Sequence, residues 1–307
     1  MFSIYRVSKH NIVISKICIV KNFKKEIMIK NVIFFLEDIL KFIFAILKCL
    51  KNPTSKISEM HSKNNICILG NGPSLLKVLE SEDVRSTDFC TVNFSINSDV
   101  FYKLQPQMHV FADPVFWQRL DDKNVKLVLD NVRNRINWNI IFYVPSVCPK
   151  NFRNRLAENK YVRVLTYPVV NFDNKLIIFD KLKFFCYKRN LFIPPTSNVI
   201  VACIFIAILM GYRNINLYGV EHSWLAYVSI GDDNLMYVED HHYYGTEKTK
   251  WVAGDGSVVK LTTFLYNMYL AFSSYHILRK FAQYYGDVKI LNCTEGSWID
   301  AFERKLN

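Results

Sequence analysis

Short apolar runs of about five residues recur through residues 65–300, and polar or amphipathic stretches separate them. Runs of this length that are rich in Ile, Val and Phe predict buried strands. The predicted strands are 66–70, 89–94, 108–112, 139–144, 161–166, 214–219 and 288–292. Helical patterns lie between several of them, at 74–81, 97–104, 197–212 and 258–285. Strands that alternate with helices predict an α/β fold, with a doubly wound, mostly parallel sheet that helices cover on both faces.

Two other parts of the chain have a less regular pattern. Residues 120–137 and 150–190 are basic and aromatic without clean periodicity, so apart from the strand at 161–166 no element is predicted there. Residues 222–250 form a long polar and aromatic connection. Connections of this length in a compact domain are usually functional lids, and we therefore expect a lid at about 222–257.

Residues 31–50 (NVIFFLEDILKFIFAILKCL) predict an amphipathic helix. Its four charges, Glu37, Asp38, Lys41 and Lys48, fall within one arc of about 100° on a helical wheel, and apolar residues dominate the rest. No uncharged run reaches the roughly 20 apolar residues that a transmembrane helix needs, and charges interrupt what would be the apolar region of a signal peptide. The pattern is typical of an interfacial helix on an anionic membrane. A helix buried against the protein's own core, or against a second subunit of a homo-oligomer, is the alternative.

The polar residues 51–65 contain Pro53 and predict a linker. We therefore divide the chain into a basic N-terminal segment, 1–64, and a globular domain, 65–307. The formal charge of +12 belongs mainly to the first part, because residues 1–65 hold 12 Lys/Arg and 4 Asp/Glu, whereas the remainder holds 27 and 23. This distribution argues against a nucleic-acid groove across the protein and for a local anionic partner. The eight cysteines show no CxxC spacing, which indicates a reduced, cytoplasmic chain without a disulfide framework or a zinc site.

The sequence Gly-Asn-Gly-Pro-Ser at 70–74 follows the first predicted strand and precedes a predicted helix. Glycines let the backbone approach a ligand closely, and the first N–H groups of a helix suit an anion. Ser74 is the expected cap of those donors when no ligand is bound. The turn therefore indicates a phosphate or nucleotide site, and a plain strand-to-helix turn is the alternative.

Polar residues also follow the other predicted strands, where ligands bind in a sheet of this kind. Asn93 and Asp113 end the second and third strands, and Glu221 and His222 follow Gly219. Each of these has a structural alternative as a turn or cap residue. The sequence Thr196-Ser197-Asn198 offers three candidate caps before an apolar helix and predicts a second anion or ribose site.

The lid contains His241 and His242 just after Glu239 and Asp240. A histidine near carboxylates can act as a general base at neutral pH. A surface histidine pair is the structural alternative, and a divalent metal site is a weaker one because adjacent residues of an extended segment point to opposite sides.

The motifs at 70–74, 93, 196–198, 202–221 and 242–245 together resemble family 42 glycosyltransferases, which are bacterial sialyltransferases that act on lipooligosaccharide. They also resemble a related group that includes pterin pyrophosphokinase-like and flagellin-glycosylation proteins. The resemblance implies a GT-A-like variant of the Rossmann fold. It further implies an inverting, metal-independent transfer onto a glycan or glycolipid acceptor, with a CMP-activated sugar as co-substrate and no other cofactor. It implies peripheral attachment to the inner face of the cytoplasmic membrane.

The resemblance also implies roles for single residues. Asn71 and Asn93 match positions that contact the nucleotide, and Thr196 and Ser197 match a Thr-Ser pair whose following Gly is Asn198 here. The family has Asn where this chain has Asp113, which we expect to bind a sugar hydroxyl or the acceptor, or to indicate a different donor. The complete set expected to bind the donor is Gly70, Asn71, Gly72, Ser74, Asn93, Asp113, Thr196, Ser197, Asn198, Gly219 and Glu221.

The lid departs from the family pattern. The catalytic histidine of the family follows a Tyr-x-Gly turn, where this chain has Thr246. We therefore expect His242 or His241 to be the base, and Tyr227 and Tyr237 to be the nearest candidates for stabilising the leaving phosphate. A diphosphate-transferring kinase that uses ATP and magnesium, and a non-catalytic membrane-associated binding protein, are the alternative functions.

Overall fold

An eight-stranded sheet forms the centre of the protein in a computed structural model, which describes residues 9–57, 64–75, 87–242, 245–252 and 257–305. All neighbouring strands of this sheet are parallel, in the order β11-β10-β6-β1-β2-β3-β4-β5. The strands are β1 (Asn65–Leu69), β2 (Asp88–Val92), β3 (Met108–Val110), β4 (Ile140–Pro145), β5 (Val162–Tyr167), β6 (Asn214–Tyr218), β10 (Lys289–Asn292) and β11 (Glu303–Arg304). The seven predicted strands and the doubly wound α/β fold are confirmed.

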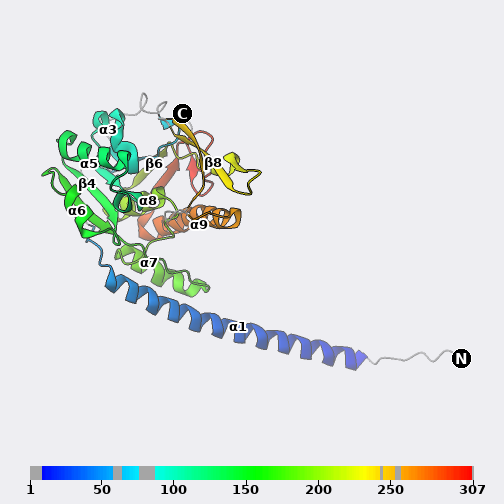
Figure 1. The fold of residues 1–307 in the computed structure, drawn as a ribbon. Helices are drawn as coiled ribbons and strands as arrows, with labels where there is room; N and C mark the ends of the chain where they lie inside the picture. The colour runs from blue at the N-terminus through cyan, green and yellow to red at the C-terminus, as the bar shows by residue number, and fades with distance from the viewer. Residues whose placement is uncertain (1–8, 58–63, 76–86, 243–244, 253–256, 306–307) are drawn as a thin grey trace.

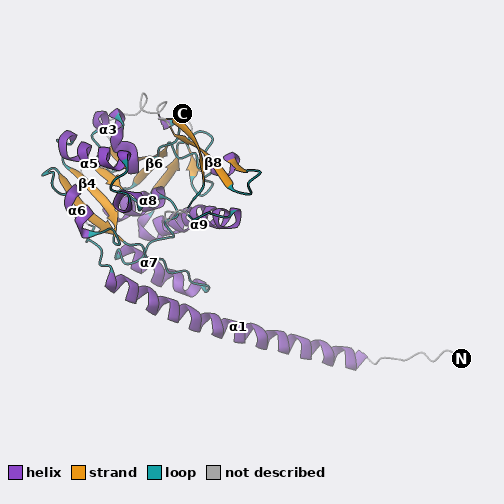
Figure 2. Ribbon diagram, in the orientation of Figure 1, coloured by secondary structure: helices purple, strands orange, loops and turns teal. Residues whose placement is uncertain are grey.

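Helices cover both faces of this sheet, as Figure 2 shows. Successive residues of one strand point to opposite layers. Phe142 of β4, for example, packs in one hydrophobic cluster and Tyr143 in the other. One layer contains α7 (Asp180–Lys188), α8 (Val199–Met210) and α9 (Leu261–Gly286). The other contains α3 (Asp99–Leu104), α4 (Val115–Gln118), α5 (Lys123–Arg135) and α6 (Lys150–Leu156). The remaining single-turn helices are η1 (Asn93–Asn97), η2 (Ile177–Phe179) and η3 (Trp224–Tyr227).

The predicted helices at 97–104, 197–212 and 258–285 correspond to α3, α8 and α9, whereas the one at 74–81 lies largely outside the described residues. Helices α5, α6 and α7 formed where the sequence pattern was irregular. The start of α5 had a readable signal, because the Asp122 carboxylate accepts hydrogen bonds from Asn124 N at 2.8 Å and Val125 N at 3.2 Å. An aspartate in this place is a strong N-cap.

Strand order reverses between β1 and β6. The chain runs from β1 outward to β5 and then returns through α7 and α8 to β6, on the other side of β1. In open α/β sheets the ligand binds outside the carboxyl ends of the strands at such a reversal. The glycine turn after Leu69 and the segment after Tyr218 meet at this point.

The expected lid is a second sheet and not a loop, which corrects the sequence-based expectation. Strands β7 (Val228–Ile230), β8 (Met236–His242) and β9 (Gly245–Lys250) pair antiparallel. Met236 and Val238 alternate with polar residues along β8 and are buried with Phe264 near the start of α9. This period of two is a strand signal, but the many polar residues of the segment concealed it.

Residues Lys9–Lys51 form one helix, α1, whose amino-terminal part extends beyond the rest of the protein (Figure 1). Its carboxyl-terminal part packs on the layer of α7 and α8, where Ala45 is buried and Phe42 contacts the rings of Phe172 and Phe192. Ser55, within the expected linker, exchanges hydrogen bonds with Thr166. No helix among the described residues has the length and hydropathy that crossing a bilayer requires.

Candidate functional site at the carboxyl ends of β1 and β6

The glycine turn lies directly against the end of β6. Gly70 N donates to Tyr218 O, and Gly72 N donates to Gly219 O, both at 2.8 Å. A Cβ atom on Gly70 would lie 2.2 Å from Gly219 O, and Gly219 has a φ of +63°. The two connections approach this closely only because neither position carries a side chain.

The Glu221 side chain reaches from the end of β6 into the glycine turn. Its Oε1 atom accepts a hydrogen bond from Ser74 N at 2.8 Å, and a Cβ atom on Gly72 would lie 1.5 Å from its Oε2 atom. The carboxylate of Glu221 therefore satisfies the Ser74 N–H group, whereas the helical N–H groups that the Ser74 side chain was expected to cap lie outside the described residues. A ligand phosphate would compete with this carboxylate for the same N–H group.

Three oxygen atoms at this junction are buried without a hydrogen-bond partner among the described residues. They are Asn71 Oδ1, Ser74 Oγ and Glu221 Oε2. Buried polar atoms are normally paired, so each of these three calls for a partner, and a bound ligand is one such partner. Ligand hydroxyl or amino groups have donors for these oxygens. No group of three or more metal-ligating side chains occurs among the described residues.

Asn93 and Asp113 lie at the neighbouring strand ends, and both already hold backbone. Asn93 has a φ of +47°, and its Oδ1 atom accepts from Ala112 N at 3.1 Å, which ties the end of β2 to the end of β3. Asp113 Oδ1 accepts from Val115 N at 2.9 Å, before the first turn of α4. The structure thus places both residues on the expected edge of the sheet and gives each a structural task there.

The predicted helix start at 196–198 also lies at this edge. Asn198 caps α8, because its Oδ1 atom accepts from Ile200 N at 2.7 Å. Its Nδ2 atom donates to the Tyr275 hydroxyl at 2.6 Å and lies 3.4 Å from His222 Nδ1. Thr196 is half-buried and Ser197 is exposed on the connection that precedes the cap. Of the three candidate caps, the structure selects Asn198 and joins it to the segment after β6.

His222 is the centre of this junction, although the sequence suggested no role for it beyond its place after a strand. Its side chain is buried, its φ is +52°, and its ring stacks on Trp224 with centroids 4.3 Å apart. Burial lowers the pKa of His222 to about 3, so the imidazole is neutral at physiological pH. Its Nδ1 atom lies 3.1 Å from the Tyr275 hydroxyl, which burial keeps protonated by raising its pKa.

Asn198 Nδ2 donates to the Tyr275 oxygen, which leaves the Tyr275 hydroxyl proton for His222 Nδ1. We assign His222 the tautomer that this arrangement requires, in which Nδ1 accepts and Nε2 carries the proton. A positive φ is uncommon for a residue other than glycine and is found preferentially at functional sites. Nothing in the sequence pattern distinguished Trp224 or Tyr275 from other aromatic residues.

The candidate lid residues lie in η3 and in the second sheet. Tyr227 is exposed in η3, and the Tyr237 hydroxyl donates to Asp233 Oδ2 at 2.9 Å, near the turn between β7 and β8. This hydrogen bond is the main cause of a raised pKa for Tyr237. The backbone of His241 pairs with Thr246, and that of His242 pairs with Gly245. The side chains of both histidines lie outside the described part of the structure, so their role as a base stays a prediction.

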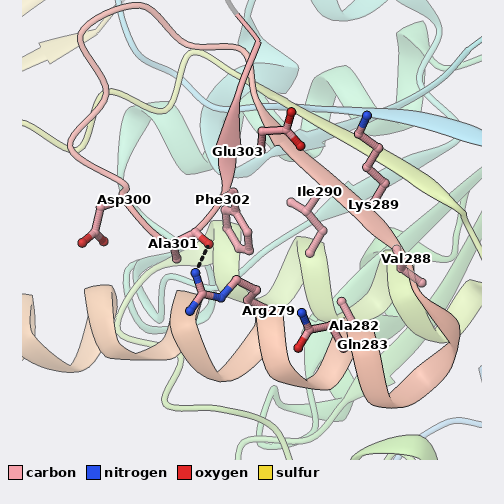
Figure 3. A pocket seen from close by; sticks show the side chains of 10 residues that line it. All are labelled: Arg279, Ala282, Gln283, Val288, Lys289, Ile290, Asp300, Ala301, Phe302 and Glu303. Carbon is pink, nitrogen blue, oxygen red and sulfur yellow. Dashed lines mark hydrogen bonds between the residues drawn. The ribbon is translucent and has the colours of Figure 1, made fainter.

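A separate hollow of about 430 Å³ lies between α9 and the strands β10 and β11 (Figure 3). Arg279 Nη1 donates to Ala301 O at its edge, at 3.3 Å. None of the residues that the sequence predicts for the site lines this hollow. Its charged side chains are of both signs, with Arg279 and Lys289 near Asp300 and Glu303, so it offers no concentrated charge to a ligand.

No protein-family model matches this chain, and no curated protein matches it. Among solved structures it is similar to the monofunctional alpha-2,3-sialyltransferase Cst-I from Campylobacter jejuni. That match covers 82% of this chain and 84% of the other, with 17% sequence identity and a TM-score of 0.40. Similarity at this level assigns neither an activity nor a residue role to this chain.

Proposed function

We propose that this protein is a glycosyltransferase that moves a sialic-acid-like sugar from a CMP-activated donor onto a cell-surface glycan such as lipopolysaccharide or capsule. The observation that supports the proposal is the junction between the glycine turn after β1 and the segment after β6. The motifs at 70–74, 93 and 196–198 and the end of the 202–221 motif, though far apart in the sequence, lie at this edge of the sheet. The unpaired buried oxygens at this junction belong to Asn71, Ser74 and Glu221. A nucleoside supplies hydroxyl and amino donors.

In this proposal the glycine turn holds the nucleoside end of the donor. Glu221 Oε2 and Asn71 Oδ1 accept hydrogen bonds from it, and Nε2–H of His222 is available as a donor at the same edge. The phosphate then lies outside the position that the Glu221 carboxylate occupies, because two anions would repel each other there. Lid residues cover the sugar, and Tyr227 and Tyr237 are the candidates for stabilising the leaving phosphate.

The acceptor hydroxyl needs a base. His242, or else His241, remains the proposed one, because neutral His222 has its Nδ1 occupied by Tyr275 and offers only a donor. Positioned general-base catalysis contributes about 10²–10⁴-fold to a rate. We place the enzyme on the cytoplasmic side of the inner membrane, where activated sugars are available.

A thermal-shift series tests the nucleotide assignment. CMP is expected to raise the unfolding temperature with or without magnesium, whereas UDP, GDP and ATP are expected to do so less. A ligand at 100 times its dissociation constant stabilises the native state by about 2.7 kcal/mol. Asn71→Ala should reduce the CMP shift, and Asn124→Ala, an exposed asparagine on α5, should leave it unchanged. A shift that requires both ATP and magnesium would instead identify the diphosphate-transferring kinase.

A further inference from the structure

Helix α1 meets the rest of the protein with its charged side. Asp38 is fully buried, and its carboxylate accepts hydrogen bonds from Lys175 N and Leu176 N at 2.9–3.0 Å. Glu37 pairs with the Lys175 ammonium, and Lys41 Nζ donates to Asp173 O at 3.0 Å. The acidic side chains of Glu37 and Asp38 therefore face the protein, beside the apolar side chains of Phe42 and Ala45, although charged side chains of a surface helix usually face water.

The opposite side of α1 is apolar and exposed. We call six of its residues the outer stripe: Val32, Leu36, Leu40, Ile43, Leu47 and Leu50. They recur at intervals of three and four, which puts them on one face of a helix, and at 100° per residue that face is opposite to Asp38 and Ala45. Between 49% and 75% of each side chain is exposed. At 1.5 Å per residue the stripe is about 27 Å long.

The apolar surface continues from α1 onto the adjoining segment of η2. An apolar groove of about 470 Å³ lies between α1 and this segment, and Val32, Phe35, Leu176 and Ile178 are among the residues that line it. Ile178 and its neighbour Ile177 are 73% and 84% exposed. Monomeric proteins rarely leave a continuous apolar surface of this extent in water.

The exposed charges of α1 from Lys30 to Lys51 are positive. Docking uses both acidic residues of the 31–50 stretch, Glu37 and Asp38, whereas Lys30, Lys48 and Lys51 are exposed. Further lysines precede this stretch in the sequence, and residues 1–65 carry a net charge of +8. A second copy of this chain docked through the same stripe would bring two such segments together and would be repelled. Anionic lipid headgroups would be attracted, and long lysine side chains can reach them while their stems lie on apolar surface.

We infer that the outer stripe of α1, together with Ile177 and Ile178, lies in the headgroup layer of an anionic membrane. The helix lies along the membrane surface and does not cross it, and its charged side holds the catalytic domain against it through Asp38. This inference rests on α1 and the adjoining η2 segment, and it stands whether or not the proposed transferase activity is correct.

Vesicle binding by the full chain tests the inference. We expect the protein to co-sediment with phosphatidylcholine vesicles that contain phosphatidylglycerol, to bind pure phosphatidylcholine more weakly, and to dissociate as salt is raised. The test variant is Leu40→Glu/Leu47→Glu. Its matched control, Leu127→Glu/Val147→Glu, adds the same charge at exposed apolar side chains that belong to other elements.

The test variant should lower the partition constant at least tenfold, because burying one leucine side chain is worth about ten- to a hundredfold in an equilibrium constant. The control should change it less than about threefold. The milder Leu40→Ser/Leu47→Ser should lie between wild type and the test variant, which keeps the experiment decisive if the glutamates disturb folding. Equal binding by the test variant and its control would overturn the inference. So would a wild-type dimer that Leu40→Glu/Leu47→Glu converts to monomer without any loss of vesicle binding, since a second copy would then cover the stripe.

Discussion

Asp38 and Glu221 both accept hydrogen bonds from backbone N–H groups, in different regions of this protein, but only Asp38 does so with both carboxylate oxygens. Asp38 accepts from two N–H groups with both oxygens, is fully buried, and fixes α1 to the segment before η2. Glu221 accepts from Ser74 N with one oxygen, and its other oxygen is buried without a partner among the described residues. A satisfied buried carboxylate stabilises a structure, whereas a half-satisfied one indicates a place for a ligand. The first region is an anchor for α1, and the second is the ligand site that we propose.

Removing the satisfied carboxylate should have the largest effect. Asp38→Ala leaves Lys175 N and Leu176 N without acceptors, and hydrogen bonds to charged groups contribute about 1.5–3 kcal/mol each. We expect the free energy of unfolding, measured in urea, to fall by about 3 kcal/mol. The control is Glu37→Ala on the same helix turn, which removes an ion pair with Lys175 whose side chains are both more than one-third exposed. Such pairs are worth about 1 kcal/mol or less, so a similar loss in both variants would contradict the role of Asp38 as an anchor.

A pH titration sharpens the Glu221 side of the comparison, because its neighbour His222 is buried in the neutral form. Burial lowers the pKa of His222 to about 3, and the unfolded chain takes up a proton below about 6.5. As the pH falls below about 6.5, the unfolded state binds a proton at His222 that the folded state does not bind. The free energy of unfolding therefore decreases on acidification. Between pH 7.5 and pH 5 this amounts to about 2 kcal/mol.

His222→Gln should remove that part of the pH dependence, measured by urea unfolding at both pH values. His109 is the matched comparison, because burial also lowers its pKa to about 3 and it lies under the ends of β2 and β3. His109→Gln should therefore reduce the pH dependence to a similar degree but leave CMP binding in place. An unchanged pH dependence in His222→Gln would show that the imidazole is not held neutral.

Removing the half-satisfied carboxylate should affect ligand binding more than stability. Glu221→Ala leaves one turn N–H group unpaired, and in our proposal it also removes an acceptor for the nucleoside. We expect calorimetry to show a dissociation constant for CMP that is about tenfold larger. One hydrogen bond to a charged group is worth about 1.5 kcal/mol or more, and about 1.4 kcal/mol corresponds to a tenfold change. Tighter binding would show that the carboxylate competes with the ligand phosphate, and would assign the turn to phosphate.

Much of the fold was readable from the chain, because strands and helices that are buried on most sides are made largely of apolar residues. The seven predicted strands of the parallel sheet and the helix α8 are of this kind. The elements that sequence reasoning missed have mixed composition. In β8, buried Met236 and Val238 alternate with polar residues, and burial against Phe264 decides the strand where local pattern does not. In α5, the Asp122 cap was a local signal that went unused.

The sequence predicted where the candidate site residues lie on the sheet, but it did not predict which of them contact one another. The turn at 70–74, Asn93, Asp113 and Asn198 were expected at one edge of the sheet, and they lie there. The sequence could not indicate that the Glu221 carboxylate accepts a hydrogen bond from Ser74 N in this turn, because the two residues are 147 positions apart along the chain. The same applies to Tyr275 and His222, which are 53 positions apart.

By itself, the sequence determined seven strands of the parallel sheet and the helices α3, α8 and α9, where the glycine turn lies, and that residues 31–50 carry their charges on one side of a helix. The spacing of apolar residues and the backbone freedom of glycine are properties of short segments, so they can be read directly from the sequence. Only the tertiary structure decided which carboxylate meets which N–H group, and which side of α1 faces the protein. These contacts join segments that are far apart in the sequence, and a hydrogen bond forms only when folding places its donor and its acceptor next to each other.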